Sequence, residues 1–274
     1  MPEARRLTDK VAVVTGATRG IGKQTSLLLA SRGALLVLVD RSEEPKASTP
    51  GTLAGTAAEV ASLGRAPLVI EADLSDQVEI DRVVATTLEQ AGGVDYLVNN
   101  AATTVGKTLW THAPHLTRSQ WEHGFAVNVT ASLMLIQGFW ESMRSRGGGV
   151  VVNLTSAAAT MQPMHERTGV PGGDLPDNGP MYGATKAALN RMINVVAQDG
   201  EGDNIAVILL DPVAILTETM EATLKRAGNE EVGRAMRPPT IPARAIAYLC
   251  ECEDPMRYSG QIVNAPVLCD ALGL

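Results

Sequence analysis

The stretch Thr15-Gly16-Ala17-Thr18-Arg19-Gly20-Ile21-Gly22 follows a short β-branched run, Val11–Thr15, and leads into a helical pattern. Gly16 permits a tight turn after the strand, Gly20 lets a ligand approach the backbone, and Gly22 lets the helix pack closely on the strand. The N-terminus of such a helix presents unpaired N–H groups and a positive dipole end to an anion. A strand, a glycine-rich turn and a helix in this order predict a loop that binds the pyrophosphate of a dinucleotide.

The rest of the chain repeats this alternation of apolar runs and helical patterns, which is typical of parallel strands joined by right-handed crossovers. We therefore predict an α/β fold with one Rossmann-type, doubly wound parallel sheet, helices on both faces, and a single domain spanning residues 1–274. The predicted strands are Val11–Thr15, Leu35–Val39, Pro67–Ile70, Tyr96–Val98, Val150–Leu154, Ile205–Leu210 and Gln261–Val263. The predicted helices are Ile21–Ser31, Thr52–Leu63, Gln77–Gln90, Trp121–Met143, Met181–Ala197 and Pro242–Cys250.

Two long segments, residues 157–180 and 211–240, interrupt the alternation on the side of the sheet where ligands bind. Loops longer than about 12–15 residues commonly have a function. We therefore expect both segments to be substrate loops that make an apolar site. The apolar residues that suggest this are Met161, Met164, Leu216, Met220 and Leu224.

The composition excludes several classes of protein. The chain has 274 residues, with 23 Lys and Arg against 30 Asp and Glu, and the resulting net charge of −7 disfavours binding to nucleic acid or anionic membranes. No apolar run approaches the ~18 residues of a membrane span. Cys250, Cys252 and Cys269 match neither a disulfide framework nor a zinc spacing, so we expect reduced thiols, a cytoplasmic protein and no metal site.

Asp40 ends the second predicted strand, 18 residues beyond Gly22. A carboxylate at this position accepts hydrogen bonds from the adenosine ribose and repels a 2′-phosphate, which favours NAD(H). Arg19 and Arg41 offer a competing interpretation, because both could pair with the 2′-phosphate of NADP(H). We give Asp40 the greater weight.

Tyr182 and Lys186 are four residues apart, so they share one face of a predicted helix. An ammonium beside a phenol favours the phenolate and lowers its pKa from about 10. Such a tyrosine can exchange a proton with a carbonyl or alcohol oxygen while a hydride moves to or from a nicotinamide.

Over almost its whole length the chain resembles the classical short-chain dehydrogenases/reductases, and more distantly their hydroxysteroid-dehydrogenase-like branch. The shared motifs, in order, are TGATRGIG at 15–22, Asp73-Leu74, NNAA at 99–102, Asn128 in FAVNVTA, Ser156 in VVNLTS, and YGATK at 182–186.

The resemblance implies a catalytic set of four residues. Ser156 would orient the substrate oxygen and Tyr182 would be the acid/base. Lys186 would hold the nicotinamide ribose and tune Tyr182, and Asn128 would anchor a water that relays protons from Lys186.

The resemblance also implies further contacts with the cofactor. Asp73 and Leu74 would line the adenine pocket, although Asp73 could instead cap the following helix. Asn100 and Ala101 would lie along the cofactor. Residues after the sixth strand would meet its nicotinamide half, namely Pro212, Ile215 and Thr217.

Three departures from the family pattern concern regions where subunits and substrates would bind. Val213 stands where a glycine is usual, so we expect that loop to take a different course. Ser156 and Tyr182 are 26 residues apart, about twice the usual separation. Residues 264–267 replace a common V-D-G-G segment, which puts the usual subunit contacts there in doubt.

These observations predict an NAD(P)-dependent oxidoreductase that interconverts a ketone and a secondary alcohol, with a small and apolar substrate. Two alternatives stay open: a non-catalytic dinucleotide-binding regulator or scaffold on the same fold, and reduction of a C=N or C=C bond. By resemblance we expect a homotetramer or homodimer, formed through the two long predicted helices Trp121–Met143 and Met181–Ala197.

Overall fold

Seven parallel strands form one sheet in the computed structural model, which describes residues 6–41, 51–104, 113–160 and 179–274. Their order is β3 (Leu68–Glu71), β2 (Leu35–Asp40), β1 (Val11–Thr15), β4 (Tyr96–Asn99), β5 (Gly149–Leu154), β6 (Ile205–Asp211) and β7 (Ile262–Asn264). From β1 the chain adds β2 and β3 on one side of the sheet, and from β4 it adds β5, β6 and β7 on the other side. The crevice between the carboxyl ends of β1 and β4 is therefore the point where such sheets bind ligands.

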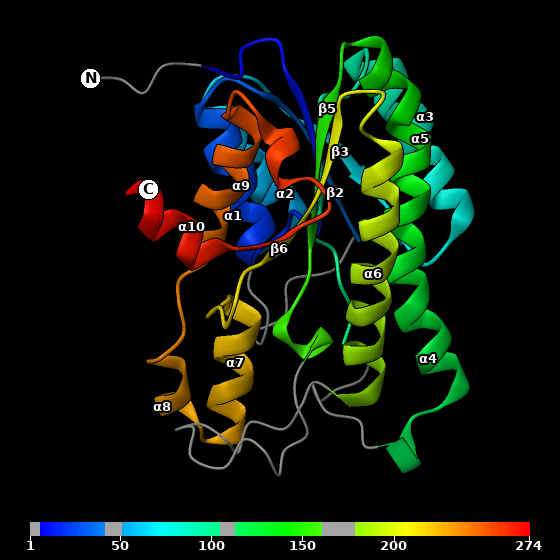
Figure 1. The fold of residues 1–274 in the computed structure, drawn as a ribbon. Coiled ribbons are helices and arrows are strands. Elements are labelled where there is room, and N and C mark those ends of the chain that lie inside the picture. The colour runs from blue at the N-terminus through cyan, green and yellow to red at the C-terminus, as the bar shows by residue number, and fades with distance from the viewer. Residues whose placement is uncertain (1–5, 42–50, 105–112, 161–178) are drawn as a thin grey trace.

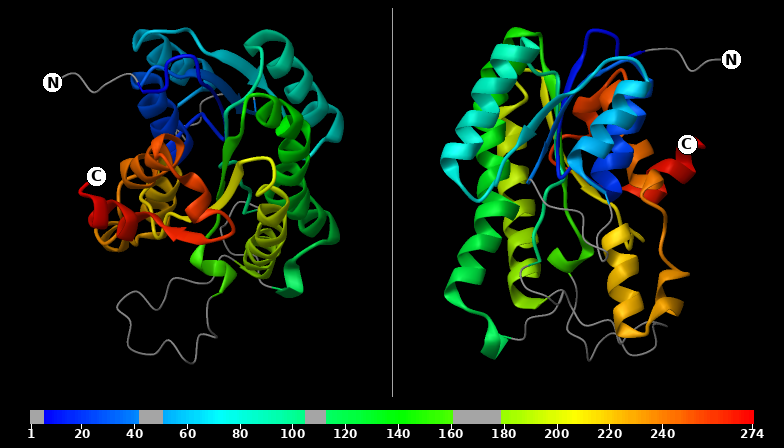
Figure 2. Two further views of the ribbon diagram at one scale, coloured as in Figure 1. Left: turned by 45° about the horizontal axis from the view of Figure 1, so that its top comes forward. Right: turned by 180° about the vertical axis from the view of Figure 1, so that it is seen from behind.

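Helices cover both faces of the sheet, as Figures 1 and 2 show. One face carries α1 (Gly20–Ser31), α2 (Leu53–Ser62), α9 (Thr240–Glu251) and α10 (Ala265–Leu272). The other carries α3 (Gln77–Ala91), α4 (Arg118–Phe125), α5 (Ala131–Ser145) and α6 (Gly179–Asp199). Two further helices, α7 (Glu218–Ala227) and α8 (Glu230–Gly233), follow β6 and lie beyond the carboxyl ends of the strands (Figure 1). The predicted doubly wound α/β fold is confirmed.

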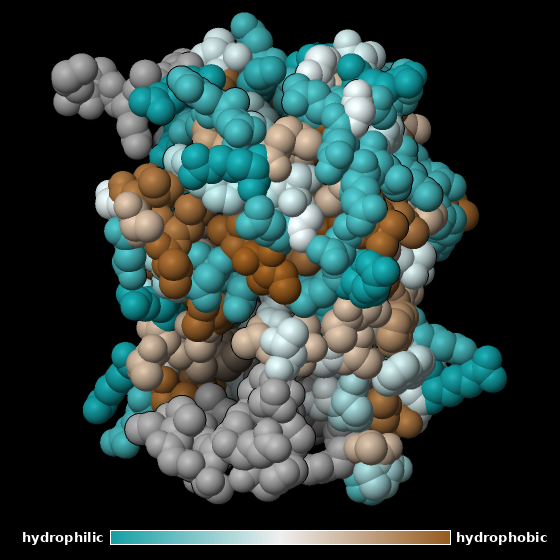
Figure 3. Space-filling model, in the orientation of Figure 1, coloured by the Kyte–Doolittle hydropathy of each residue, from teal (hydrophilic) through white to brown (hydrophobic). Residues whose placement is uncertain are grey.

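Apolar side chains also gather on one part of the outer surface, over α10 and the edge strand β7 (Figure 3). Ile262 is 50% exposed and Val267 64% exposed, and Leu272 and Leu274 also face solvent. None of the helices in the described residues, α10 included, combines the length and apolar character needed to cross a membrane.

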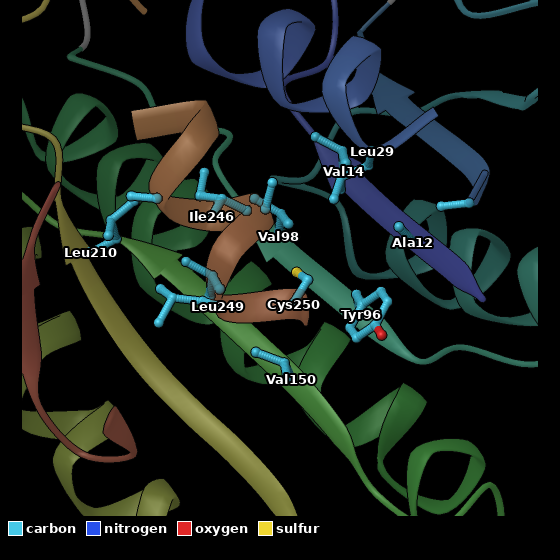
Figure 4. Close-up of a cluster of buried hydrophobic side chains, with 14 of the residues drawn as sticks. Ala12, Val14, Leu29, Tyr96, Val98, Val150, Leu210, Ile246, Leu249 and Cys250 are labelled. Atoms are coloured by element: carbon cyan, nitrogen blue, oxygen red, sulfur yellow. The ribbon is translucent and has the colours of Figure 1, made fainter. Parts of the chain in front are cut away.

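The core consists of two aliphatic clusters, one on each face of the sheet. Alternate residues of a strand point to opposite faces, so in β1 Ala12 and Val14 enter one cluster while Val11 and Val13 enter the other. Figure 4 shows the first cluster, where Ile246 and its neighbours on α9 meet side chains of β1, β4 and β5. These two clusters hold the sheet rigid, and with it the carboxyl ends of the strands.

Two predictions about local structure differ from the structure in detail, and one helix was not predicted. The predicted helix Trp121–Met143 consists of α4 and α5 joined by a π-helical segment, Ala126–Thr130. The predicted loop 211–240 contains α7 and α8; α7 is polar on average, but its few apolar residues, Met220 and Leu224 among them, recur at helical spacing. Helix α10 was not predicted, because it follows β7 with no intervening turn signal.

Candidate active site

The phosphate loop joins β1 to α1 as a cradle that only glycine can form. Gly16 has a φ of 66°, in the left-handed region that glycine favours. A Cβ at Gly22 would lie 2.2 Å from the carbonyl oxygen of Gly16, so the turn and the helix meet there without room for a side chain. Arg19 is the N-cap of α1, and its side chain makes no capping hydrogen bond. The N–H groups at the start of α1 therefore receive no cap from this side chain, and Gly20 and Ile21 lie at the wall of the crevice.

The loop after β4 is tied to the phosphate loop by side-chain hydrogen bonds. Asn100 donates from Nδ2 to the carbonyl oxygens of Thr15 at 2.8 Å and Gly16 at 3.1 Å. The hydroxyl of Thr15 accepts from the backbone N–H groups of Asn100 and Ala101, each at 3.0 Å. Sequence reasoning missed Thr15 as the residue that joins the two loops.

Asp40 lies at the end of β2 and contacts the phosphate loop directly. Its Oδ2 accepts from the backbone N–H of Thr18 at 3.0 Å, and its Oδ1 accepts from that of Arg41 at 2.8 Å. The carboxylate is thus held in place by two backbone donors. Both Asp40 and Arg41 line the same cavity as the glycine loop.

Asp73 lies at the same end of the cavity and does not cap the following helix. Its Oδ1 accepts from the backbone N–H and the hydroxyl of Ser75, whereas Asp76 caps α3 through the N–H of Val78. Burial alone would raise the pKa of Asp73. The hydrogen bonds from Ser75, with smaller contributions from Arg41 and His123, hold that pKa below its usual value.

A cavity of about 480 Å³ runs along the carboxyl edge of the sheet and brings most of the predicted residues together. Those that line it are Gly16, Arg19, Gly20, Ile21, Asp40, Arg41, Asp73, Leu74, Asn100, Ala101, Tyr182 and Thr217. Thr18 and Gly22 are buried behind its wall. Among the further residues that line it, sequence reasoning did not select His123, which lies near Asp73, or Val127.

Tyr182 lies near the start of α6, and its phenol is hydrogen-bonded to the side chain of Ser156. The neighbouring Thr155, which could have competed with Ser156 for this role, instead donates its hydroxyl to Oδ1 of Asn190 at 2.5 Å. Burial raises the pKa of Tyr182, the Ser156 hydrogen bond lowers it, and the charge of Asp211 raises it further. The net pKa is above the usual value, contrary to the lowered pKa expected from Lys186.

The position of Lys186 explains why the expected lowering of the Tyr182 pKa is absent. Its ammonium makes no hydrogen bond to the phenol oxygen. Its Nζ lies 5.7 Å from the centre of the Tyr182 ring and donates to the carbonyl oxygen of Leu154 at 2.7 Å. The side chain is buried, and burial lowers the pKa of Lys186 to about 8. Tyr182 and Lys186 both lie on α6, as their four-residue spacing predicts.

The lowered pKa of Lys186 predicts a specific dependence of stability on pH. Lysine in an unfolded chain has a pKa of about 10.4, so between about pH 8 and 10.4 the unfolded state binds more protons than the folded state. The free energy of unfolding contributed by Lys186 therefore rises with pH across this window. Lys186→Met should lack that rise in denaturant titrations, and parallel pH curves for the two proteins would contradict the assignment.

Asn128 lies in the π-helical segment and its side chain is fully buried. Its Oδ1 accepts from the N–H of Thr103 at 2.7 Å, and its Nδ2 donates to the carbonyl oxygen of Thr103 at 2.9 Å and to the hydroxyl of Thr185 at 3.0 Å. Thr185 in turn donates to the carbonyl oxygen of Tyr182 at 2.8 Å. Asn128 thus connects the cavity wall at Thr103 to the helix that carries Tyr182 and Lys186. Single π-bulges within helices are common at functional sites.

The segment after β6 places Thr217 at the phosphate loop. Thr217 caps α7 by accepting from the N–H of Met220 at 3.2 Å, and its side chain lies against Gly20. Ile215 is buried and forms a β-bridge with Arg237. Neither Ile215 nor Pro212 belongs to the described lining of the cavity.

Val213 shows how the chain accommodates the missing glycine. Its φ of 65° lies in the left-handed region, where a β-branched residue carries strain of about 1–3 kcal/mol. Val213 therefore has a backbone conformation that glycine adopts without strain. The turn is supported by a hydrogen bond of 2.9 Å from the N–H of Val213 to Oδ1 of Asp211.

The substrate side of the cavity was expected to have an apolar wall, but its described residues include both apolar and polar side chains. Met220 lines the cavity together with Thr219 and Thr223, whereas Leu216 and Leu224 lie against α8 at a separate hollow. Met161 and Met164 are outside the described residues, as is most of the predicted loop 157–180.

The chemistry of these groups fits a dinucleotide along the cavity. The α1 N–H groups suit a pyrophosphate, Asp40 suits ribose hydroxyls, and Tyr182 and Lys186 lie where an oxygen beside a nicotinamide could exchange a proton. This layout defines the class of oxidoreductases that use a nicotinamide dinucleotide.

Comparison with known proteins gives the family. The short chain dehydrogenase family matches residues 10–227. NAD-dependent glycerol dehydrogenase of Listeria innocua is 31% identical over 242 residues, which cover 88% of this chain and 83% of that protein. The chain therefore belongs to the short-chain dehydrogenase/reductase family and is an NAD(P)-dependent oxidoreductase of alcohol and ketone groups.

Solved structures show the same similarity across nearly the whole chain. L-sorbose reductase of Gluconobacter frateurii, solved with NADPH and L-sorbose, matches with a TM-score of 0.77 at 26% identity, covering 96% of this chain and 97% of that one. A 7α-hydroxysteroid dehydrogenase, solved with NADH and a 7-oxo bile acid, matches with a TM-score of 0.76 at 25% identity, covering 95% and 94%.

Proposed function

We propose that the chain interconverts a ketone and a secondary alcohol, with Tyr182 as the acid/base. The observation that carries this proposal is the position of Tyr182, which lines the same cavity as the glycine loop and is hydrogen-bonded to Ser156. The bound nicotinamide would supply or accept the hydride. In reduction the Tyr182 hydroxyl would give its proton to the substrate oxygen, while the Ser156 hydroxyl would hold that oxygen in place.

Lys186 and Asn128 support Tyr182 in this proposal without contacting its hydroxyl in the structure. In this proposal the ammonium of Lys186, whose Nζ lies 5.7 Å from the centre of the Tyr182 ring, would approach the phenol and favour a negative charge on it as its proton leaves. The nicotinamide ribose contact of Lys186 and the water relay through Asn128 stay predictions. The four hydrogen-bonding contacts of Asn128 and Thr185 support a positioning role for Asn128.

For the cofactor we propose NAD(H). Two backbone hydrogen bonds hold the carboxylate of Asp40 at the cavity wall, where it would meet the adenosine ribose. A 2′-phosphate at that position would have to approach a fixed negative charge. Arg19 and Arg41 line the same end, and they are the residues through which NADP(H) could still bind.

For the substrate we propose a small molecule that carries polar groups next to the reacting carbon, in place of the apolar substrate expected from the sequence. Thr103, Thr219 and Thr223 line the cavity beside Met220, so the described wall offers hydroxyl groups as well as apolar surface. The similarity to a glycerol dehydrogenase and an L-sorbose reductase supports a hydroxylated substrate. Similarity to a hydroxysteroid dehydrogenase keeps an apolar ring system as the competing candidate.

A cofactor-coupled absorbance screen tests this proposal. Polyols, ketoses, steroid alcohols and simple ketones would be assayed in both directions with NAD(H) and NADP(H) in parallel. We expect turnover of polyols or ketoses with NAD(H). Turnover of C=N or C=C substrates alone would contradict the proposed reaction, and a complete lack of turnover with intact cofactor binding would favour a regulator.

We also propose that the protein works in the cytoplasm as a homodimer or homotetramer. The exposed apolar side chains of β7 and α10, Ile262 and Val267 among them, offer a surface for a second copy. Light scattering of the purified chain measures the mass in solution, and a monomer at micromolar concentration would contradict this assembly.

A further inference from the structure

The start of α1 is in contact with a carboxylate from a distant part of the chain. Glu218, the first residue of α7, accepts a hydrogen bond at its Oε2 from the backbone N–H of Gly20 at 2.9 Å. Gly20 is the first residue of α1 and follows the phosphate loop. The two residues are 198 positions apart, so only the fold brings them together.

Packing around Gly20 holds α7 against the loop. A Cβ built on Gly20 would lie 2.9 Å from Cγ2 of Thr217 and 3.8 Å from Oε2 of Glu218. Thr217 also caps α7, so the first turn of α7 and the first turn of α1 are in direct contact. Glu218 is half-buried there, unlike Glu221 three residues further along α7, which faces solvent.

The Glu218 carboxylate accepts from the N–H of Gly20, a donor that the pyrophosphate of a dinucleotide would also need. An anion at a helix N-terminus is stabilised by the free N–H groups and by the helix dipole, and a carboxylate and a phosphate satisfy both in the same way. Two anions cannot share one N–H without strong repulsion. Binding of the cofactor therefore requires Glu218 to leave Gly20.

We propose that Glu218 is a built-in competitor of the cofactor pyrophosphate and sets the affinity of the chain for its dinucleotide. This inference rests on the proposed cofactor site at the glycine loop. Displacement of Glu218 would move the first turn of α7, whose Thr219 and Met220 line the same cavity. Cofactor binding would thereby also reshape the wall that faces the substrate.

Calorimetric titration of the full-length chain with ADP-ribose and with adenosine tests this proposal. ADP-ribose carries the pyrophosphate and adenosine does not. Losing a charge-assisted hydrogen bond to a competitor should make Glu218→Ala bind ADP-ribose about tenfold more tightly, with Glu218→Gln intermediate because its amide oxygen can still accept from Gly20. Adenosine affinity should change less than about twofold. Glu221→Gln, which removes the same charge from the same turn of α7, should bind both probes like the unmodified chain.

Each other outcome has a defined meaning. Equal ADP-ribose affinity in the unmodified chain, Glu218→Gln and Glu218→Ala would overturn the competition. An equal gain for Glu221→Gln would assign the effect to net charge, and an equal gain for adenosine, which is uncharged, would assign it to a change outside the pyrophosphate site. Either result would overturn the proposal as well. Failure of ADP-ribose to bind any of the proteins would instead show that the proposed dinucleotide site is wrong. Thermal unfolding of each variant confirms that the compared proteins are folded.

Discussion

Replacing Tyr182 with Phe is expected to lower turnover by about 10²–10⁴-fold, the range that a positioned acid/base contributes. The substitution removes only the phenol oxygen, which is hydrogen-bonded to Ser156, and leaves the ring packed beside Lys186. The dissociation constant for the dinucleotide should stay within about twofold, because the glycine loop and Asp40 lie at the other end of the cavity. Coupled assays and calorimetry measure the two quantities separately.

Tyr258→Phe is the matched control for this experiment. Its hydroxyl is hydrogen-bonded to Arg257 and lies 3.4 Å from the hydroxyl of Tyr248, away from the described cavity wall. Removing it should leave turnover nearly unchanged. If Tyr182→Phe keeps full turnover, the proposed mechanism is wrong. If it loses cofactor binding as well, Tyr182 has a structural role that the geometry does not indicate.

Replacing Asp40 with Asn is expected to shift the ratio of NADP(H) to NAD(H) affinity by about tenfold or more in favour of NADP(H). A carboxylate about 4 Å from a phosphate costs about 1–4 kcal/mol, depending on exposure to solvent. Asn keeps an oxygen that can accept from Thr18, so the loop should hold its shape while the charge disappears. Asp40→Ala should show the same shift with weaker binding of both cofactors, because the N–H of Thr18 then loses its partner.

Glu71→Gln controls for the loss of a negative charge near this end of the sheet. Glu71 lies opposite Asp40 in the pairing of β2 with β3, but it is exposed and does not line the cavity. Its cofactor ratio should therefore match that of the unmodified chain. A strong preference of the unmodified chain for NADP(H) would show that Arg19 and Arg41 outweigh Asp40.

Much of the site could be predicted because its residues act through local geometry. Gly16, Gly20 and Gly22 are required by one turn and one helix start. A Cβ at Gly22 would lie only 2.2 Å from the carbonyl oxygen of Gly16, which explains why glycine is needed at that spacing. The four-residue spacing of Tyr182 and Lys186 correctly placed both on one helix. The sign of the pKa shift of Tyr182 could not be predicted in this way. It depends on burial and on two residues outside α6, namely Ser156, which follows β5, and Asp211 at the end of β6.

Contacts between residues that are far apart in the chain could not be predicted from the sequence. Helix α7 is amphipathic but polar on average, so its segment was predicted to be a loop, and its position is set by packing on α8 and on the phosphate loop. His123 enters the cavity from α4, and no spacing relates it to Asp73. Asn128 was found by its motif, yet its π-helical backbone and its contacts with Thr103 and Thr185 came only from the structure.

By itself, the sequence determined the alternation of strands and helices, the glycine cradle and the residues at the ends of β1, β2 and β5. Those features depend on backbone conformation and on short-range periodicity, which are written in neighbouring residues. Only the tertiary structure decided that Glu218 occupies the N–H of Gly20, that Lys186 donates to Leu154, and that the substrate wall mixes threonine with methionine. These contacts join residues far apart in the chain, and no local pattern records which of them become neighbours when the sheet assembles.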